Sequence, residues 1–433
     1  MTGIEARLQE LRDRGLYRRL RMISGPQGPN VVLDGEPVLL LCSNNYLGLA
    51  DHPRVREAAA DAAMRWGVGA GASRLVSGAM TVHRRLEERL TEFKGSEACV
   101  LFGSGYLANT GVVAALAQPG EVVFSDAFNH ASIVDGCRLS RAEVFVYEHG
   151  DVEHLAWGLE QAGGDGALIV TDSVFSMDGD VAPLEEICLL ARRHDVRVVV
   201  DEAHGLGALG PGGRGAVAAA GLEDEVDVVV GTLGKALGSY GAYATCSTRM
   251  AKFLVNTARP LIFSTALPPP AVAGALAALE LLVAEPRRVE RLASNADCLR
   301  EALTEAGLPA GPSRTQIVPL VIGDATEAMR VCEAAIEQGV FAQAIRPPTV
   351  PDGTSRLRLA VMATHTKTEL RAAAGTLAEV MGATGVQARP ASAPAEPATG
   401  AVARHRARVT AAVFDGEAPD WVVPSRDAPR RAA

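Results

Sequence analysis

The feature that most constrains the fold is a series of short apolar runs between residues 98 and 245, separated by segments of helical periodicity. Several runs are rich in β-branched residues and lack polar alternation, which is typical of strands buried on both faces. This order of elements predicts an α/β fold with a mostly parallel sheet covered by helices. The expected strands are Cys99–Phe102, Val122–Ser125, Val144–Tyr147, Ala167–Thr171, Val196–Asp201, Val226–Gly231 and Gly241–Thr245.

A smaller α+β unit is expected after a helical stretch at Pro269–Ala306. Its expected elements are Ile317–Ile322, Ala325–Gln338, Val340–Ile345, Arg356–Val361 and Lys367–Met381. We therefore divide the chain into an N-terminal helix and strand segment over 1–44, a large domain over 45–285, a small C-terminal domain over 286–382 and a tail over 383–433.

The tail differs in composition from the rest of the chain. Beyond Gly385 it combines Pro, Ala and Arg without an apolar period, so we expect disorder from about Val386. Two short apolar groups, Ala412–Phe414 and Trp421–Val423, interrupt it, either by chance or as a docking motif.

Charge and cysteine usage narrow the class of partner. A net charge of -9 gives no field that attracts nucleic acid or an anionic membrane, so small molecules are the expected partners. The seven cysteines are scattered and lack zinc-ligand spacing, so we expect reduced thiols and no metal site. The first 20 residues mix acids and bases without an apolar secretory core, which favours a cytoplasmic protein.

Polar residues stand at the ends of several expected strands, where open α/β sheets place their ligands. VRVVVDEAHGLG ends a buried strand with Asp201, followed by His204. VDVVVGTLGKALG ends the next strand with Thr232 and Lys235 among glycines that allow close approach of a ligand. A carboxylate buried at such a place is costly without a cationic partner.

This pair of strand ends predicts a pyridoxal-phosphate enzyme. The cofactor needs a lysine for a Schiff base and an acid that keeps its ring nitrogen protonated. Lys235 and Asp201 supply these groups. In FGSGYLANTG, Gly103, Gly105 and Tyr106 open a helix whose backbone N–H groups suit a phosphate.

Two further polar residues stand at strand ends. His130 in SDAFNHAS is placed where an imidazole could lie flat on the pyridine ring, and Ser176 in TDSVFSMDGD ends the strand before Asp201. Taken singly, each has a structural explanation as an ordinary cap or turn residue. Their order on consecutive strands favours a shared site.

Three alternatives are open to this sequence. Gly103–Ala108 also matches G-x-G-x-x-A with Asp126 downstream, which is the pattern of a nicotinamide dehydrogenase. That pattern lies late in the chain and leaves Asp201 and Lys235 unexplained. DEAH at Asp201–His204 resembles a helicase box, but no phosphate-binding loop of the G-x-x-x-x-G-K-[ST] type precedes it. A catalytically silent protein of this fold would lack Lys235.

The chain resembles the α-oxoamine synthases, fold type I pyridoxal-phosphate enzymes, from about Tyr17 to Met381. The similar phrases are LYRRLR, SNNYLGLADHP, GSGYLANTG, FNHASIVDG, VFSMDGDVAPL, DEAHGLGALGPGGRG, GTLGKALGSYGAY and IRPPTVPDGTSRLRL. The resemblance implies a large domain with a mostly parallel sheet, a smaller C-terminal α+β domain, and a homodimer with active sites at the interface. No role carries over to the tail.

The resemblance also implies individual roles. Lys235 forms the Schiff base and acts as the base, Asp201 pairs with the ring nitrogen, His204 bonds the phenolic oxygen, and His130 stacks on the ring. The other residues implied to hold the cofactor are Gly105, Tyr106, Ser176, Thr232 and, toward the partner's phosphate, Thr265. The residues implied to contact substrate are Arg18, His130, Thr349 and Arg358.

Within this family the chain is most similar to the enzyme of biotin biosynthesis that condenses L-alanine with a pimeloyl thioester and releases carbon dioxide. Two phrases favour it over the sister enzyme that joins glycine to an acetyl group: IRPPTVPDGTSRLRL and LYRRLR. A donor that ends in a carboxylate needs a cation, for which Arg18 and Arg19 are candidates, although both could be solvated helix-end charges. The acyl carrier, coenzyme A or a carrier protein, stays open.

Overall fold

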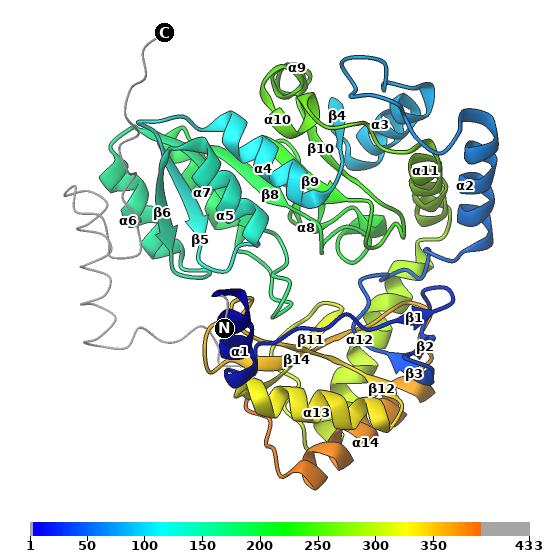
Figure 1. The fold of residues 1–433 in the computed structure, drawn as a ribbon. Coiled ribbons are helices and arrows are strands. Elements are labelled where there is room, and N and C mark those ends of the chain that lie inside the picture. The colour runs from blue at the N-terminus through cyan, green and yellow to red at the C-terminus, as the bar shows by residue number, and fades with distance from the viewer. Residues whose placement is uncertain (1–2, 391–433) are drawn as a thin grey trace.

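The structure is a computed structural model that describes residues 3–390. Figure 1 shows the largest sheet and its helices in one lobe, and two smaller sheets in a second lobe. The tail prediction beyond residue 390 lies outside the described residues. The expected boundary of disorder at Val386 is wrong, because Val386 is buried in the second lobe and the backbone N–H of Arg389 donates to the Val321 carbonyl oxygen.

The central sheet has seven strands in the order β4-β10-β9-β8-β7-β5-β6, and only β10 runs antiparallel to its neighbours. Its strands are β4 (Ala98–Phe102), β5 (Val122–Asp126), β6 (Glu143–Tyr147), β7 (Gly166–Asp172), β8 (Arg197–Asp201), β9 (Val228–Thr232) and β10 (Ala242–Cys246). All residues of β5, β9 and β10 are buried, as expected of strands covered on both faces. The predicted α/β fold with a mostly parallel sheet is confirmed.

Two buried clusters cover the faces of this sheet, because alternate residues of each strand point to opposite sides. The helices of this lobe are α2 (Pro53–Trp66), α3 (Thr81–Lys94), α4 (Gly105–Leu116), α5 (Ala131–Ser140), α6 (Val152–Ala162), α7 (Leu184–His194), η1 (Pro211–Gly213), α8 (Ala216–Ala220), α9 (Thr248–Thr257), α10 (Arg259–Ile262) and α11 (Pro269–Ala284).

The position of β4 is unfavourable to the dinucleotide interpretation. A dinucleotide fold places its glycine turn after a strand with parallel neighbours. Here β4 lies at the sheet edge and pairs only with antiparallel β10. The Asp126 carboxylate already accepts hydrogen bonds from the Phe128 and Gly150 backbone and from His149.

The second lobe contains two small sheets in the orders β1-β2-β3-β12 and β11-β14-β13. Its strands are β1 (Ile23–Ser24), β2 (Asn30–Leu33), β3 (Glu36–Leu40), β11 (Ile317–Gly323), β12 (Val340–Phe341), β13 (Gln343–Ile345) and β14 (Ser355–Ala360). Its helices are α1 (Gly3–Asp13), α12 (Arg287–Glu305), α13 (Ala325–Glu337) and α14 (Lys367–Thr384).

Two sequence-based elements are each divided in the structure. The expected strand Val340–Ile345 is split at the fully buried Ala342, because β12 pairs with β3 and β13 pairs with β14 of the other sheet. The expected helical stretch Pro269–Ala306 is two helices, α11 and α12, that meet at 81° beside Pro286. Proline lacks the N–H that would continue the first helix.

Within the described residues 3–390, no single helix is long and apolar enough to cross a membrane. The helices α11 and α12 reach that length and composition only as a bent pair.

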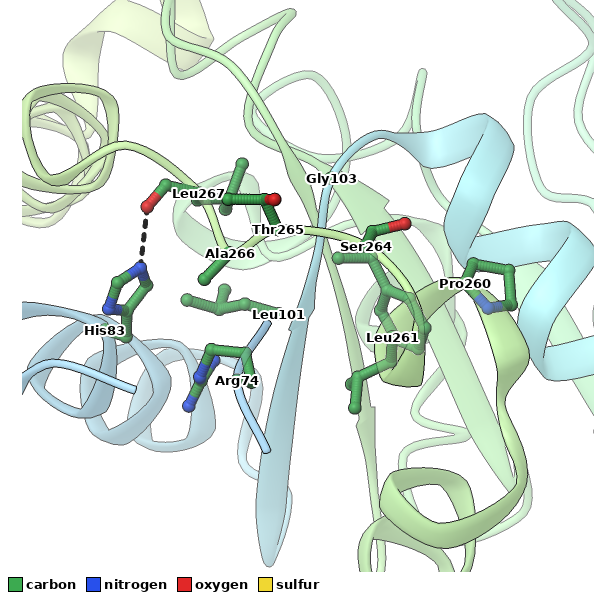
Figure 2. Close-up of a pocket in the computed structure, with 11 residues that line it drawn as sticks. Arg74, His83, Leu101, Gly103, Pro260, Leu261, Ser264, Thr265, Ala266 and Leu267 are labelled. Atoms are coloured by element: carbon green, nitrogen blue, oxygen red, sulfur yellow. Dashed lines mark hydrogen bonds between the residues drawn. The ribbon is translucent and has the colours of Figure 1, made fainter. Parts of the chain in front are cut away.

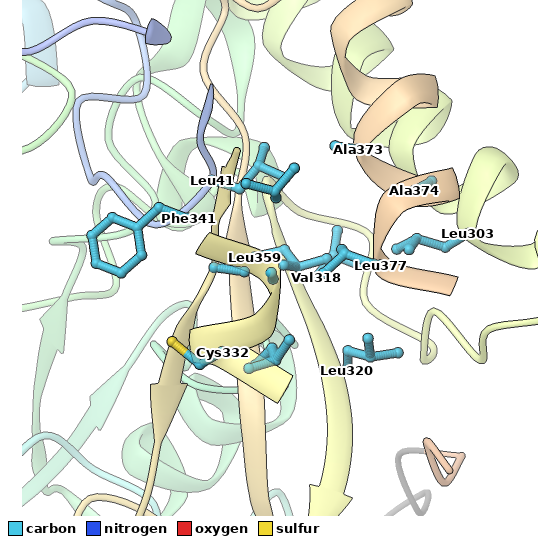
Figure 3. Close-up of a cluster of buried hydrophobic side chains, with 14 of the residues drawn as sticks. Leu41, Leu303, Val318, Leu320, Cys332, Phe341, Leu359, Ala373, Ala374 and Leu377 are labelled. Atoms are coloured by element: carbon cyan, nitrogen blue, oxygen red, sulfur yellow. The ribbon is translucent and has the colours of Figure 1, made fainter. Parts of the chain in front are cut away.

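The second lobe has its own apolar core. Figure 3 shows β-strand and helix side chains meeting there, including Leu359 from β14, Val318 from β11 and Leu377 from α14. Leu41, which follows β3, belongs to the same cluster and is fully buried. The N-terminal segment and the C-terminal unit therefore share one core.

We predict that Leu377→Ala lowers the free energy of unfolding by about 2–5 kcal/mol, because it leaves a cavity in a fully buried cluster. The matched control is Leu189→Ala on α7, where the side chain is 59% exposed and the expected change is within about 0.5 kcal/mol. Chemical denaturation of both variants checks this. Equal stability of the two variants would contradict the assigned core.

Candidate active site

Asp201 ends β8 with its side chain buried at the carboxyl edge of the sheet. The Asn109 side-chain amide donates to one carboxylate oxygen at 2.6 Å, and the backbone N–H of Ala203 donates to the other at 2.7 Å. Both donors are neutral, so they orient the carboxylate without balancing its charge. A buried carboxylate held in this way favours a cationic ligand.

Lys235 begins a chain of hydrogen bonds that leads to the second lobe. Its Nζ lies 2.8 Å from Nε2 of His204, and Nδ1 of His204 lies 2.6 Å from the hydroxyl of Tyr46. The same hydroxyl accepts a hydrogen bond from Nη2 of Arg358 at 3.2 Å. One continuous network therefore joins the lysine after β9 to the arginine on β14.

The pKa of the Lys235 amine is lower than that of an ordinary lysine. Burial lowers its pKa to about 8, and the Arg358 cation acts in the same direction, while the Asp201 and Asp172 carboxylates oppose the shift. Burial also lowers the pKa of His204 well below its ordinary value, as do the neighbouring charges of Lys235, Arg358 and His130.

These directions fix the protons of the network. A neutral His204 accepts at Nε2 from the Lys235 ammonium, so its proton lies on Nδ1 and is donated to Tyr46. Tyr46 donates its own proton to Oδ1 of Asn44 at 3.1 Å. The ring proton of His204 and the hydroxyl proton of Tyr46 then each have an acceptor.

His130 stands at the start of α5, next to the Asp201 carboxylate. Its backbone N–H donates to Asp172 at 2.7 Å, and its Nδ1 lies 2.7 Å from the hydroxyl of Ser132. Ser132 also accepts from Asn109, the residue that orients Asp201. Burial lowers the pKa of His130, so a neutral imidazole faces the site.

The start of α4 lies beside the carboxyl end of β9. Ser104 caps this helix through the backbone N–H of Leu107, and the first N–H groups of a helix have no partner within it. A Cβ added to Gly105 would approach the Cβ of Thr232 to 4.0 Å, so the helix start and the end of β9 lie side by side. The Thr232 hydroxyl donates to the Gly241 carbonyl oxygen at 3.1 Å.

The structure therefore brings together most of the residues expected at the site. Lys235 and His204 are hydrogen-bonded to each other. Asp201 lies close enough to both His130 and Lys235 to affect their pKa values. The backbone carbonyl of Ser176 accepts a hydrogen bond from Nε of Arg358.

Other expected residues lie away from this network. Tyr106 is 45% exposed and its hydroxyl donates to Asp135. Thr265 pairs with Ser73 and lines a separate small cavity, in which Figure 2 shows it near Gly103. In the same view, His83 bonds the Leu267 carbonyl at 2.8 Å.

Arg18 and Thr349 lie beside one segment of the second lobe. The Arg18 guanidinium donates to the carbonyl oxygens of Leu16 and Pro347, at 3.3 and 2.9 Å. Thr349 follows two residues after Pro347, and its backbone N–H donates to the Arg346 carbonyl oxygen.

Four residues of the site were given no role by the sequence. Asn44, Tyr46 and Asn109 stand in phrases that carried the family resemblance, but their contacts join segments far apart in the chain. Asp172 accepts the His130 N–H, and burial together with the charge of Asp201 raises its pKa well above the ordinary value. Its place at the end of β7, beside the end of β8, was the available signal.

Comparisons with known proteins agree with this geometry. A family model described as aminotransferase class I and II matches residues 36–377. The 8-amino-7-oxononanoate synthase of Citrifermentans bemidjiense is 51% identical over 88% of this chain and 98% of its own, and that of Geobacter sulfurreducens is 51% identical over 87% and 97%.

Solved structures are similar as well. Serine palmitoyltransferase from S. paucimobilis, solved with a bound PLP-myriocin aldimine, matches with a TM-score of 0.84 and 34% identity over 89% of this chain and 98% of its own. The 8-amino-7-oxononanoate synthase of Francisella tularensis matches with a TM-score of 0.70 and 25% identity over 80% and 98%. The chain therefore belongs to the class I and II aminotransferase family and, within it, to the α-oxoamine synthases.

Proposed function

We propose that this chain is a pyridoxal-phosphate-dependent 8-amino-7-oxononanoate synthase of biotin biosynthesis. A bond forms between Cα of L-alanine and the carbonyl carbon of a pimeloyl thioester, the C–S bond breaks to release the thiol, and the alanine carboxylate leaves as carbon dioxide. The observation that carries the proposal is the Lys235 amine, whose pKa is lowered to about 8, near the buried Asp201 carboxylate. The identity of about 50% to 8-amino-7-oxononanoate synthases supports the choice of substrates.

The donor set fits pyridoxal phosphate. Lys235 offers an amine for the aldehyde, Asp201 an anion for the ring nitrogen, and His130 a neutral ring for the pyridine face. The start of α4 at Gly105, beside Thr232, suits the phosphate. When bound, the cofactor would be linked to Lys235 and would accept the electron pair left at Cα of the amino acid.

Lys235 then acts as the base. Once substrate has displaced it, its Nζ takes the Cα proton, which its depressed pKa makes possible near neutral pH. Neutral His204 holds Nζ at 2.8 Å and so keeps the amine directed into the site. After carbon dioxide leaves, the same amine can return a proton to that carbon.

Arg358 is suited to the amino-acid carboxylate. Its guanidinium donates to Asn44, Tyr46 and the Ser176 carbonyl, all of which are neutral acceptors. Its charge is thus oriented but not balanced by those partners, and a guanidinium can grip a carboxylate with two parallel hydrogen bonds. Gripping the carboxylate fixes which Cα bond faces the base.

Other roles extend the proposal. We infer a homodimer in which Thr265 approaches the partner's phosphate, and we assign Tyr106 to the cofactor and Thr349 to the acyl substrate. Thr265 and Gly103, which precedes the start of α4, line the same small cavity. A cytoplasmic location stays a prediction.

We predict that Lys235→Ala abolishes turnover and the visible absorption of lysine-bound cofactor, because one change removes both the covalent anchor and the base. Lys252→Ala, at an exposed position on α9, is the matched control and should keep both properties. Absorption spectra and a coupled thiol-release assay check this. Wild-type turnover by Lys235→Ala would contradict the mechanism.

We predict that Asp201→Asn lowers kcat by about 10²-fold or more while the fold persists, because a neutral amide cannot hold a proton on the ring nitrogen. The measurement is the rate of α-proton exchange of L-alanine in deuterated water, together with a melting curve. An exchange rate equal to that of the wild type would remove Asp201 from this role.

We predict that Arg18→Ala weakens use of a pimeloyl thioester more than use of a neutral thioester of equal length, by about 10-fold or more, because the distal carboxylate loses its cation. The ratio of kcat/KM for the two donors in both proteins decides this, with Arg14→Ala, an exposed arginine paired with Glu10, as the matched control. An unchanged ratio for Arg18→Ala assigns the carboxylate to another group. A preference for glycine with an acetyl thioester would point to the sister enzyme.

A further inference from the structure

His149 occupies a position that the reaction described above does not use. It follows β6, and its side chain is 13% exposed. Nδ1 lies 2.9 Å from Oδ1 of Asp126, and Nε2 lies 2.7 Å from Oδ2 of Asp180. One imidazole thus bridges two carboxylates.

The first carboxylate fixes the segment that carries His130. Asp126 ends β5 and is buried. It accepts hydrogen bonds from the backbone N–H groups of Phe128 and Gly150, at 2.8 and 2.9 Å. The Phe128 ring stacks on the His149 ring, with centroids 4.3 Å apart and planes at 18°. His130 follows two residues later.

The second carboxylate fixes the turn that carries Ser176. The Asp180 carbonyl oxygen accepts the Phe175 N–H at 3.0 Å, which closes the turn between residues 175 and 180. The Phe175 ring meets the His149 ring edge-on at 4.3 Å. The imidazole therefore has one aromatic contact from each of the two segments it bridges.

The same turn is fastened to β14 on its other side. Arg358 donates to the Ser176 carbonyl oxygen, and Arg356 forms an ion pair with Asp178. The turn thus lies between His149 and the arginine that we assign to the substrate carboxylate. A shift of the turn would move that arginine relative to His130.

We propose that His149 is a positioning residue, whose imidazolium fastens the His130 segment to the Ser176 turn and so sets the stacking imidazole against Arg358. This inference rests on the proposed function, because it assumes that His130 faces the cofactor ring and that Arg358 grips the substrate.

The bridge requires a proton on both ring nitrogens, because each faces a carboxylate oxygen. Burial opposes the charge on His149, but the hydrogen bonds that its ring donates to Asp126 and Asp180 outweigh this effect and raise its pKa to about 10. Among the described residues, Asp178 also interacts electrostatically with His149 and is itself paired with Arg356 from β14. Because the folded pKa lies above the ordinary value of 6.5, the stabilisation is complete below pH 6.5 and is lost as pH rises through about 10.

The test replaces the imidazole with an amide that can satisfy only one carboxylate. His149→Gln can donate to Asp126 or Asp180, but its carbonyl oxygen then faces the other carboxylate. We expect the variant to bind cofactor, to show altered visible circular dichroism of the bound cofactor, and to lose about 10- to 100-fold in kcat, since misplacement by about 1 Å costs that much. His194→Gln, at the end of α7, is the matched control and should behave as wild type.

Rescue separates positioning from general destabilisation. In the double variant His149→Gln with Asp180→Asn, the N–H of the introduced asparagine can donate to the carbonyl oxygen of the introduced glutamine. The bridge is then restored without the imidazolium charge. We expect kcat and the circular dichroism signal to return toward wild type. A double variant no better than His149→Gln, or a single variant that equals wild type in both readouts, would overturn the proposal.

A third variant covers the case in which His149→Gln does not fold. Asp180→Asn removes one of the two groups that raise the pKa of His149, so the circular dichroism signal of the cofactor should be lost at a lower pH than in wild type. An identical pH dependence would count against the bridge. If the wild-type protein itself carries no cofactor absorption, the proposed function fails instead.

Discussion

The buried carboxylate of Asp201 is the constraint on which the site depends. It lies at the edge of the central sheet, where its two hydrogen-bond donors are neutral and do not balance its charge. Such a group is costly to bury unless a cation meets it. In the proposed function a protonated pyridine supplies that cation, and Lys235, which we assign to the Schiff base, follows the neighbouring strand. The parallel strands bring the two groups together, because their carboxyl ends meet along one edge.

The hydrogen-bond network from Lys235 to Arg358 also links the small lobe to the candidate site. Arg358 comes from a sheet that shares its core with the N-terminal segment, yet it bonds Tyr46 and the Ser176 carbonyl beside the large sheet. In the proposed function, the orientation of the substrate thus depends on how the two lobes are held together. The turn closed by Asp180 is where this connection and the His149 bridge converge.

Much of the fold followed from the sequence, because strands buried on both faces leave continuous apolar runs that few other structures produce. The break at Pro286 and the change of sheet at Ala342 were missed, since apolar pattern alone does not report which partner a segment finds. The positions of Asp201 and Lys235 at the ends of neighbouring strands could be predicted. Tyr46 and Asn109 could not, because their roles arise from contacts across about 90 residues or more of chain. Tyr106 and Thr265 lie on more exposed or separate surfaces, where a second subunit would decide their contacts.

The central claim is that one lysine of this chain carries the cofactor. The sequence contains four lysines, Lys94, Lys235, Lys252 and Lys367, and Lys94 is engaged in a buried ion pair with Glu202. Borohydride reduction of the purified protein followed by peptide mass spectrometry identifies the lysine that bears the pyridoxyl group. We expect the label on the peptide containing Lys235 alone. A label on another lysine, or none in protein supplied with the cofactor, would contradict it.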